Sequence, residues 1–270
     1  MDITVHGPDG PALAYAYTGG QRFDPALPCV VFLHGALNDH SVWALLARWF
    51  AHHGHAVLAV DLQGHGRSAG APPASVEAAA DWMLGVLDAV GVRRAAWVGH
   101  SMGSLIALEA AARAPQRASH LVLVGTAYPM KVSAALLDTA REQPLRAIDL
   151  VNAYSHAGLA AKPSFPGPGT WLHGANRALM RRMQAGQPAL NLFLHDFSVC
   201  DGYAGGLEAA ARVTCPATLV LGTRDQMTLP QQTGALAETL RAQRIMVAAG
   251  HALMAEAPDE VLAALRVALG

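Results

Sequence analysis

The sequence is poor in charge and in long apolar runs. Charged residues make up 14% of the 270 residues, and the formal net charge is −1. Because no run of lysine or arginine is dense, the sequence predicts no nucleic-acid-binding face. No segment approaches the ~18 uninterrupted apolar residues of a membrane span, and the opening MDITVHGPDG lacks a basic stretch followed by an apolar one. We therefore expect neither a membrane span nor a secretory signal.

Cysteine is also scarce. The chain has three cysteines, Cys29, Cys200 and Cys215, which is an odd number. They lie far apart and fit no Cys-x-x-Cys metal or redox spacing, so we expect a reduced, cytoplasmic setting. Apolar residues are plentiful, at 52% of the chain. A chain of this length and composition fits one large α/β domain, or a core with an inserted subdomain.

Apolar, β-rich runs alternate with helical patterns along most of the chain. Alternation of this kind with short connections predicts βαβ units and a mostly parallel, twisted sheet flanked by helices. The expected strands are 3–6, 12–17, 29–35, 55–62, 94–100, 119–126, 217–225 and 244–251, and the expected helices are 41–53, 75–90, 102–114, 231–242 and 258–269.

This alternation stops between residues 127 and 213, where helical patches occur without a strong strand signal. The pattern predicts a core formed by residues 1–126 and 214–270, and a helical cap formed by 127–213 over the active edge of the sheet. The segment KPSFPGPGTW (162–171) is rich in proline and glycine. We expect it to be a loop or hinge that gates entry.

One short motif, Gly99-His100-Ser101-Met102-Gly103, joins an expected strand to an expected helix. A serine hydroxyl is a weak nucleophile and must be exposed to a base and to a substrate carbonyl together. A tight strand-to-helix turn exposes it in this way, and glycines on both sides relieve the crowding. The motif predicts Ser101 as a nucleophile; the alternative is a glycine-rich turn whose serine only caps the helix.

Two further strand ends carry suitable partners for Ser101. His251 follows Gly250 at the end of the last expected strand, where a side chain projects over the carboxyl edge of a parallel sheet. Histidine suits a general base and acid near neutral pH. Asp225 ends the strand that begins at residue 217 and is predicted to orient His251. Asp61 also ends a strand, and we expect it to hold the backbone of the following loop.

Several segments resemble the α/β-hydrolase family: the turn around Ser101, FLHGALNDHSVW (32–43), DLQGHGRS (61–68), LGTRDQMT (221–228) and AGHALMAEAPDEV (249–261). The resemblance implies an α/β-hydrolase fold with an inserted helical cap. In this family the nucleophile, the acid and the histidine follow in that chain order, which Ser101, Asp225 and His251 match.

A tetrahedral intermediate needs two hydrogen-bond donors for its oxyanion. One is expected to be the backbone N–H of Met102, the residue after the nucleophile. By resemblance to the family, the other is the N–H of Ala36, which follows His34-Gly35. The resemblance gives His34 a structural role.

A competing motif, Gly64-His-Gly66-Arg-Ser-Ala69, formally matches a dinucleotide-binding fingerprint. That fingerprint requires a helix to begin at its last positions, and the prolines at 72 and 73 prevent this. We therefore expect no nucleotide. Hydrolysis through an acyl-enzyme on Ser101 is expected to need neither a metal nor an organic cofactor.

The substrate pocket is expected to draw on apolar residues of the helical segment and of the loops near the triad. The pocket candidates are Tyr128, Trp171, Phe193, Met227 and Leu253. Most of the further apolar residues of the helical segment (Met130, Leu172, Met180, Met183, Leu192, Phe197) are expected in its core and a minority in the pocket. Arg177, Arg181 and Arg182 are expected on a solvated helical face rather than in a clamp for an anionic substrate.

These residues favour a serine hydrolase that cleaves a carboxylic ester of a small, largely apolar substrate through an acyl-enzyme. Two main alternatives remain open, and cofactor-free perhydrolysis and cyanohydrin cleavage are also compatible with the same triad. The same triad could hydrolyse a carbon–carbon bond in a vinylogous diketone, which an arginine in the pocket would favour. The scaffold could also serve as a non-enzymatic small-molecule receptor.

Overall fold

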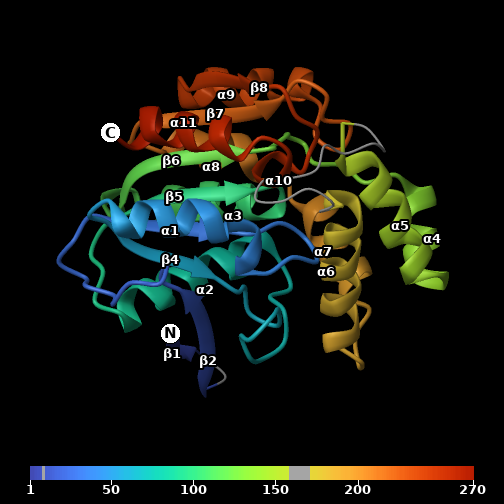
Figure 1. Ribbon diagram of the computed structural model, residues 1–270, viewed down its shortest axis with the longest axis horizontal. Coiled ribbons are helices and arrows are strands. Elements are labelled where there is room, and N and C mark those ends of the chain that lie inside the picture. The colour runs from blue at the N-terminus through green and yellow to red at the C-terminus, as the bar shows by residue number, and fades with distance from the viewer. Residues whose placement is uncertain (8–9, 158–170) are drawn as a thin grey trace.

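The computed structural model describes residues 1–7, 10–157 and 171–270. An eight-stranded sheet in the order β1-β2-β4-β3-β5-β6-β7-β8 runs through the molecule (Figure 1). The strands are β1 (Asp2–Gly7), β2 (Gly10–Tyr17), β3 (Cys29–Leu33), β4 (Ala56–Val60), β5 (Ala95–His100), β6 (Ala118–Val124), β7 (Ala217–Gly222) and β8 (Gln243–Val247). The pairs β1–β2 and β2–β4 are antiparallel, and the others are parallel. The predicted fold, a mostly parallel sheet flanked by helices, is confirmed.

Helices cover both faces of the sheet because the central strands are apolar on both sides. In β3, Val31 and Leu33 pack in one core cluster, and Val30 and Phe32 pack in another on the opposite face. The first face carries α2 (Val76–Ala89), α3 (Met102–Arg113), α8 (Gly206–Arg212) and α9 (Gly234–Leu240); the second carries α1 (Ala44–His52), preceded by the short 3₁₀ turn η1 (His40–Trp43), and α11 (Pro258–Leu269). A further 3₁₀ turn, η3 (Pro230–Thr233), precedes α9, and η2 (Pro115–Arg117) follows α3.

Five strands end earlier than the apolar pattern indicates. The strands expected over 29–35, 55–62 and 119–126 end two residues early, at Leu33, Val60 and Val124. The strand expected over 217–225 ends at Gly222, and the one expected over 244–251 ends at Val247. The chain turns there because the N–H groups of Thr223 and Arg224 donate to the carbonyls of Val247 and Ala249. Asp225 and His251 therefore lie in loops beyond the strand ends.

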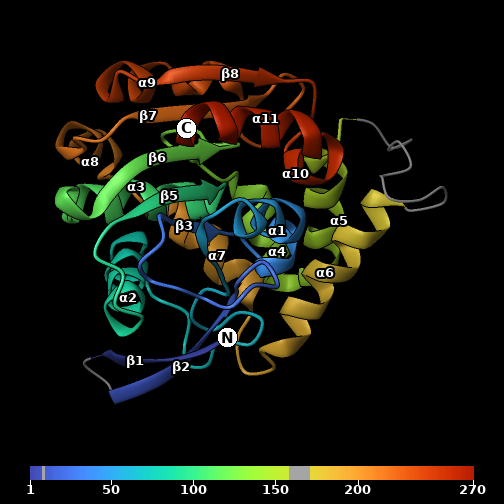
Figure 2. The ribbon, with the colours of Figure 1, turned by 60° about the vertical axis from the view of Figure 1, so that its left-hand side comes forward.

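Four helices form a layer beyond the ends of the strands, and we call α4 to α7 the helical layer. They are α4 (Ala134–Glu142), α5 (Pro144–Ser155), α6 (Leu172–Gly186) and α7 (Leu192–Gly202). Figures 1 and 2 show this layer at one end of the molecule, away from the β1–β2 pair. A third apolar cluster, which includes Ile148, Met180 and Phe193, holds the layer together. The helix α8 packs instead against α3 and α9.

The expected gating loop over 162–171 lies outside the described residues, apart from Trp171. Within the described ranges, none of the helices combines the length and the apolar character needed to cross a membrane.

Candidate active site

Ser101 lies on the turn between β5 and α3 in a strained backbone conformation, with φ of 53°. Its N–H donates to the Val124 carbonyl at 3.0 Å. A Cβ on Gly99 would lie 2.1 Å from the Gly103 carbonyl oxygen, and one on Gly103 would lie 2.5 Å from the Leu33 carbonyl oxygen. Both positions therefore require glycine, and the reason is the close backbone approach that the motif predicts.

His251 and Asp225 meet beyond the ends of β7 and β8. The Nδ1 atom of His251 lies 2.9 Å from Oδ2 of Asp225, and both side chains are buried. The N–H groups of Met227 and Thr228 donate to Oδ1 of Asp225 at 2.8 and 2.9 Å, and the Thr228 hydroxyl donates to Oδ2 at 2.7 Å. Asp225 is thus held from its own loop, and its second oxygen faces the imidazole.

The electrostatics favour an ionised carboxylate in this pair. Burial alone would raise the pKa of Asp225, but the charge of protonated His251 and hydrogen bonds from His251 and Thr228 outweigh burial and lower it to about 2. A carboxylate that stays charged at neutral pH orients the imidazole with Nδ1–H toward itself. The Nε2 atom of His251 is then free to accept a proton.

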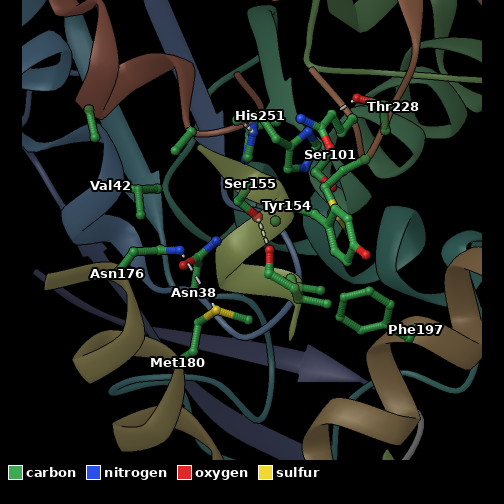
Figure 3. A pocket seen from close by; sticks show the side chains of 18 of the residues that line it. Asn38, Val42, Ser101, Tyr154, Ser155, Asn176, Met180, Phe197, Thr228 and His251 are labelled. Carbon is green, nitrogen blue, oxygen red and sulfur yellow. Dashed lines mark hydrogen bonds between the residues drawn. The ribbon is translucent and has the colours of Figure 1, made fainter. Parts of the chain in front are cut away.

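Ser101 and His251 line the same cavity, which has a volume of about 760 Å³. Figure 3 shows Ser101, Thr228 and His251 close together at one end of the cavity, with Asn38, Asn176 and Met180 farther along it. The structure thus pairs Asp225 with His251 and places Ser101 on the cavity that His251 also lines; among the described residues, no hydrogen bond joins the Ser101 hydroxyl to His251. An arrangement of this kind suits attack of a hydroxyl on a carbonyl carbon.

The loop after β3 passes close to Ser101. A Cβ on Gly35 would lie 3.1 Å from the Cβ of Ser101, and Gly35 and Ala36 both line the cavity. The N–H of Met102 belongs to the first turn of α3, where backbone N–H groups have no partner within the helix. The two N–H groups predicted as oxyanion donors therefore belong to segments that flank the serine.

His34 is engaged on both ring nitrogens. Its Nδ1 donates to the Gly35 carbonyl at 2.8 Å, and its Nε2 accepts from the Leu62 N–H at 3.0 Å. Burial and the nearby His65 lower the pKa of His34 to about 4, so the ring stays neutral. With both nitrogens occupied, His34 holds the loop and has no free atom for proton transfer, in line with its expected structural role.

His100 is a residue near the triad to which the sequence analysis gave no role. Its Nε2 donates to the His251 carbonyl at 2.9 Å, and the two rings are 4.7 Å apart. Burial, together with the neighbouring His251, lowers the pKa of His100 to about 3. His100 is therefore neutral and fixes the backbone that carries His251. Its position inside the Gly99–Gly103 motif was the available signal.

Of the five pocket candidates, Met227 lines the cavity, and the other four are wrong as far as the described residues define the lining. The Tyr128 hydroxyl donates to the Ala204 carbonyl, and its ring packs on Tyr203. Trp171 is 57% exposed and stacks on His173.

Phe193 and Leu253 fail as pocket residues because they are packed in apolar cores. Phe193 is fully buried in the cluster of the helical layer, with its ring stacked on Phe197 at 4.3 Å. Leu253, at the start of α10 (Leu253–Glu256), is fully buried in the cluster beneath α1 and α11.

Other residues of the helical segment line the cavity. The cavity is lined by Met130, Leu172, Met180 and Phe197. The apolar core of the helical layer contains Met183 and Leu192, which do not line the cavity. Four of these six residues thus line the cavity, so the expectation that only a minority of them faces the pocket is wrong. The sequence analysis missed the polar lining residues Asn38, Ser155, Asn176 and Thr228.

The arginines of α6 are engaged outside the cavity. Arg177 and Arg181 bind Asp149, with N–O distances of 2.6 and 3.1 Å, and Arg182 binds Asp39 at 2.9 Å. Among the described residues, no arginine, aspartate or glutamate lines the cavity. Lys131 does line it, and its Nζ donates to the Asp201 carbonyl at 2.5 Å.

Three side chains lie close enough together to be considered as metal ligands: Asp39, His40 and Asp61. Asp61 Oδ1 accepts from the N–H and the Nδ1 of His40, both at 2.7 Å, and Oδ2 accepts from the Arg67 N–H at 2.9 Å. Asp39 accepts from Ser41 and pairs with Arg182. These hydrogen bonds explain the cluster without a metal, because Asp61 joins the loop after β3, through His40, to the loop after β4, through Arg67. Holding the loop after β4 is the role expected of Asp61.

Known proteins share both the sequence pattern and the fold. The family model described as "alpha/beta hydrolase fold" matches residues 28–258. A putative carbamate hydrolase RutD of Klebsiella pneumoniae (strain 342) is 29% identical over 76% of this chain and 76% of its own length. The sn-1-specific diacylglycerol lipase ABHD11 of Mus musculus is 37% identical over 37% of this chain, and the match spans a third of the mouse protein, 33%.

Solved structures agree on the architecture. An enol-lactonase from Burkholderia xenovorans LB400 superposes with a TM-score of 0.81 at 22% identity, covering 96% of each chain. The esterase EaEST from Exiguobacterium antarcticum also gives a TM-score of 0.81, at 16% identity, covering 99% of this chain and 98% of its own. These likenesses establish the fold, and the match of the family model establishes the kinship. The chain belongs to the α/β-hydrolase family.

Proposed function

We propose that this chain is a serine hydrolase that cleaves carboxylic esters of small, largely apolar molecules. One observation carries the proposal. Ser101 sits on a strained turn at the cavity that His251 also lines, and the far side of the His251 ring pairs with Asp225 at 2.9 Å. Strain at a non-glycine residue and a buried carboxylate both have a cost in stability, and a nucleophile with its base explains both.

In the proposed reaction, the Ser101 oxygen attacks the ester carbonyl carbon while Nε2 of His251 takes the hydroxyl proton. The carbonyl electron pair moves to oxygen, and the N–H groups of Met102 and Ala36 stabilise that oxyanion. Collapse of the intermediate expels the alcohol, which receives the proton from His251. Water then repeats the two steps on the acyl-enzyme and releases the acid, while Asp225 stabilises the imidazolium in both halves.

The cavity lining supports a neutral ester over the carbon–carbon alternative. A substrate that carries a carboxylate next to its scissile bond calls for a cationic partner in the pocket. The α6 arginines are instead engaged with Asp149 and Asp39. Among the described residues, the lining is apolar with polar groups and one lysine, Lys131, whose Nζ donates to the Asp201 carbonyl. The printed names of relatives and neighbours, which include lipases, esterases and an enol-lactonase, point to acyl–oxygen bonds as well.

We propose that the helical layer is the cap of this enzyme. Its helices contribute Leu150, Tyr154, Leu172, Met180 and Phe197 to the cavity, opposite the loops that carry Ser101 and His251. The packing of α8 against α3 and α9 favours a cap that ends near Gly202, before α8 begins.

The test is hydrolysis of p-nitrophenyl esters of increasing acyl length by the whole chain and by two serine variants. Ser101→Ala is expected to lower kcat by about 10⁴-fold or more. Ser155→Ala is the matched control, because Ser155 also lines the cavity but its hydroxyl donates to the Val151 carbonyl of its own helix. It is expected to keep kcat within about threefold.

Undiminished turnover by Ser101→Ala would contradict the proposal. Labelling of Ser101 by a fluorophosphonate without turnover of any ester would instead favour the carbon–carbon alternative, and absence of both would favour the receptor.

A further inference from the structure

Asp196 is a carboxylate of α7 that lies buried between the helical layer and the core, with 1% of its surface exposed. Its Oδ2 accepts two hydrogen bonds, from the Leu37 N–H at 2.9 Å and from Nε2 of His65 at 2.9 Å. Leu37 belongs to the loop after β3, and His65 belongs to the loop after β4. A single side chain of the helical layer thus binds two loops of the core.

The first of these loops carries the oxyanion donor Ala36. The Gly35 carbonyl and the Ala36 N–H belong to one planar trans peptide, so the bond from His34 to the Gly35 carbonyl also sets the direction of the Ala36 N–H. The next peptide unit joins Ala36 to Leu37, and Asp196 holds its N–H. The two peptide planes around Ala36 are therefore fixed from different sides, one by the core and one by α7.

The backbone at Leu37 needs such a restraint. Its φ is 55°, a left-handed conformation that is unfavourable for leucine. The Leu37 side chain is fully buried in the cluster of the helical layer. Without the hydrogen bond to Asp196, the Leu37 N–H would be a buried donor lacking its partner, and relaxation of Leu37 would rotate the neighbouring peptide of Ala36.

The Asp196 carboxylate pairs with His65 in this buried place. Burial disfavours the imidazolium, but the Asp196 carboxylate outweighs burial and raises the pKa of His65 above its ordinary value. The ring of His65 also lies 5.2 Å from that of His34, which holds the other peptide plane. The two restraints on Ala36 are thus neighbours in space.

We infer that Asp196 is a positioning residue for the oxyanion hole, and that through it the docking of α7 determines whether the Ala36 N–H points at the reacting carbonyl. This inference rests on the proposed ester hydrolysis and on the role of the Ala36 N–H in it. It assigns to the helical layer a part in rate, in addition to lining the cavity.

The experiment compares three variants of the whole chain. Asp196→Ala removes both bonds, and Asp196→Asn keeps an oxygen that accepts from the Leu37 N–H but removes the charge. His195→Ala is the matched control, because His195 is the adjacent residue of α7 and its Nε2 contacts the Pro73 carbonyl at 3.0 Å, away from the loop of Ala36. Circular dichroism and urea unfolding establish that each variant is folded.

Two readouts separate positioning from general support. The first is kcat against KM on a p-nitrophenyl ester. The second is inhibition by a trifluoromethyl ketone, compared with the methyl ketone of the same shape. The Ser101 oxygen adds to the activated ketone carbon, its proton passes to His251, and the new alkoxide occupies the oxyanion hole. The plain ketone does not add readily and reports binding alone.

Asp196→Ala is expected to lower kcat about 10- to 100-fold with KM changed less than about threefold. Its affinity for the trifluoromethyl ketone is expected to fall in parallel, with the plain ketone unaffected. Asp196→Asn is expected to recover part of both losses, and His195→Ala to show neither. If Asp196→Ala does not fold, a parallel partial fall in Asp196→Asn supports the inference.

Unchanged kcat and an unchanged ratio of the two ketone affinities in the folded Asp196 variants would overturn the inference. Equal weakening of both ketones, or an equal loss in His195→Ala, would overturn it too, because either result means that α7 only supports the cavity. The proposed function fails separately, if Ser101→Ala retains turnover. Loss of turnover in Ser101→Ala with wild-type behaviour in both Asp196 variants refutes the positioning role alone.

Discussion

The sheet core and the helical layer contribute to the candidate site in different ways. The core supplies Ser101, Asp225 and His251 from loops at the ends of β5, β7 and β8, whose register is fixed by backbone ladders with neighbouring strands. The layer supplies much of the cavity wall, and side-chain bonds such as Arg182–Asp39 tie it to the core. We infer that loops anchored at the ends of paired strands suit the chemical step. A cavity wall joined to the core by side-chain contacts suits selection of the substrate and, through Asp196, adjustment of the oxyanion hole.

The largest expected effect is a change in the core. Asp225→Asn is expected to lower kcat for an ester by about 10⁴-fold, because the amide no longer stabilises the imidazolium or enforces the tautomer with Nδ1–H. The control is Asp138→Asn in α4, whose carboxylate makes an exposed pair with Arg141. Steady-state kinetics at saturating p-nitrophenyl butyrate measure both variants. A loss smaller than tenfold in Asp225→Asn would contradict the role of Asp225.

Alanine substitutions at two glycines, one in the core and one in the helical layer, test how closely each region is packed around them. Gly103→Ala places a Cβ 2.5 Å from the carbonyl oxygens of Leu33 and His34, backbone atoms that move only if α3 separates from β3. The free energy of unfolding is expected to fall by about 3 kcal/mol or more. Gly186→Ala, at the end of α6, meets no atom within 4 Å and is expected to raise it by about 0.5 kcal/mol. Urea unfolding measures both, and equal effects would contradict the comparison.

A change within the helical layer is expected to alter chain-length preference. Met180 lines the cavity, and Met183, one turn farther along α6, is buried in the same cluster away from it. Met180→Ala is expected to lower KM for longer acyl chains by about fourfold relative to acetate, because each buried methylene contributes about 0.8 kcal/mol. Both variants lose stability, but Met183→Ala should keep the wild-type profile. A shifted profile in Met183→Ala, or none in Met180→Ala, would contradict this division.

The smallest effect concerns the contact of the two regions at His65. The pKa of His65 is raised in the folded protein. The stabilisation of the fold by the His65–Asp196 ion pair is therefore complete below the pKa of ~6.5 in the unfolded chain, and it is lost as the pH rises through the pKa of the folded protein. The excess stability of wild type over His65→Gln is therefore expected to be larger at pH 6 than at pH 9. Urea midpoints at the two pH values measure it. A constant excess, or a larger one at pH 9, would contradict the ion pair.

The sequence predicted the core in detail because its strands are buried on both faces and end at recognisable turns. In β3, β4, β5 and β7 every residue is buried, which produces the continuous apolar runs of the sequence. Ser101 and Asp225 follow two of those runs, β5 and β7, whereas His251 follows β8, a strand with mostly exposed residues. The strand ends were placed too late at Gly222 and Val247, since apolar residues continue past the point where the chain turns.

The cavity wall could not be predicted in the same way. An apolar residue at helical spacing packs in a core or faces a cavity with the same sequence pattern, and only the packing of whole helices decides between them. Phe193 and Phe197 show this, because they stack on each other and only Phe197 reaches the cavity. For the contact between the helical layer and the core, the sequence did contain one signal. Asp196 is a carboxylate on the apolar face of α7, three residues after Phe193 and four after Leu192.

The most direct measurement is peptide mass spectrometry of the whole chain after reaction with a fluorophosphonate, with His251→Ala treated in parallel. Our account predicts a single adduct, on the peptide that contains Ser101, and labelling at least about 100-fold slower without His251. An adduct on a different residue, or equally fast labelling of Ser101 in His251→Ala, would contradict the claim that Ser101, His251 and Asp225 act together.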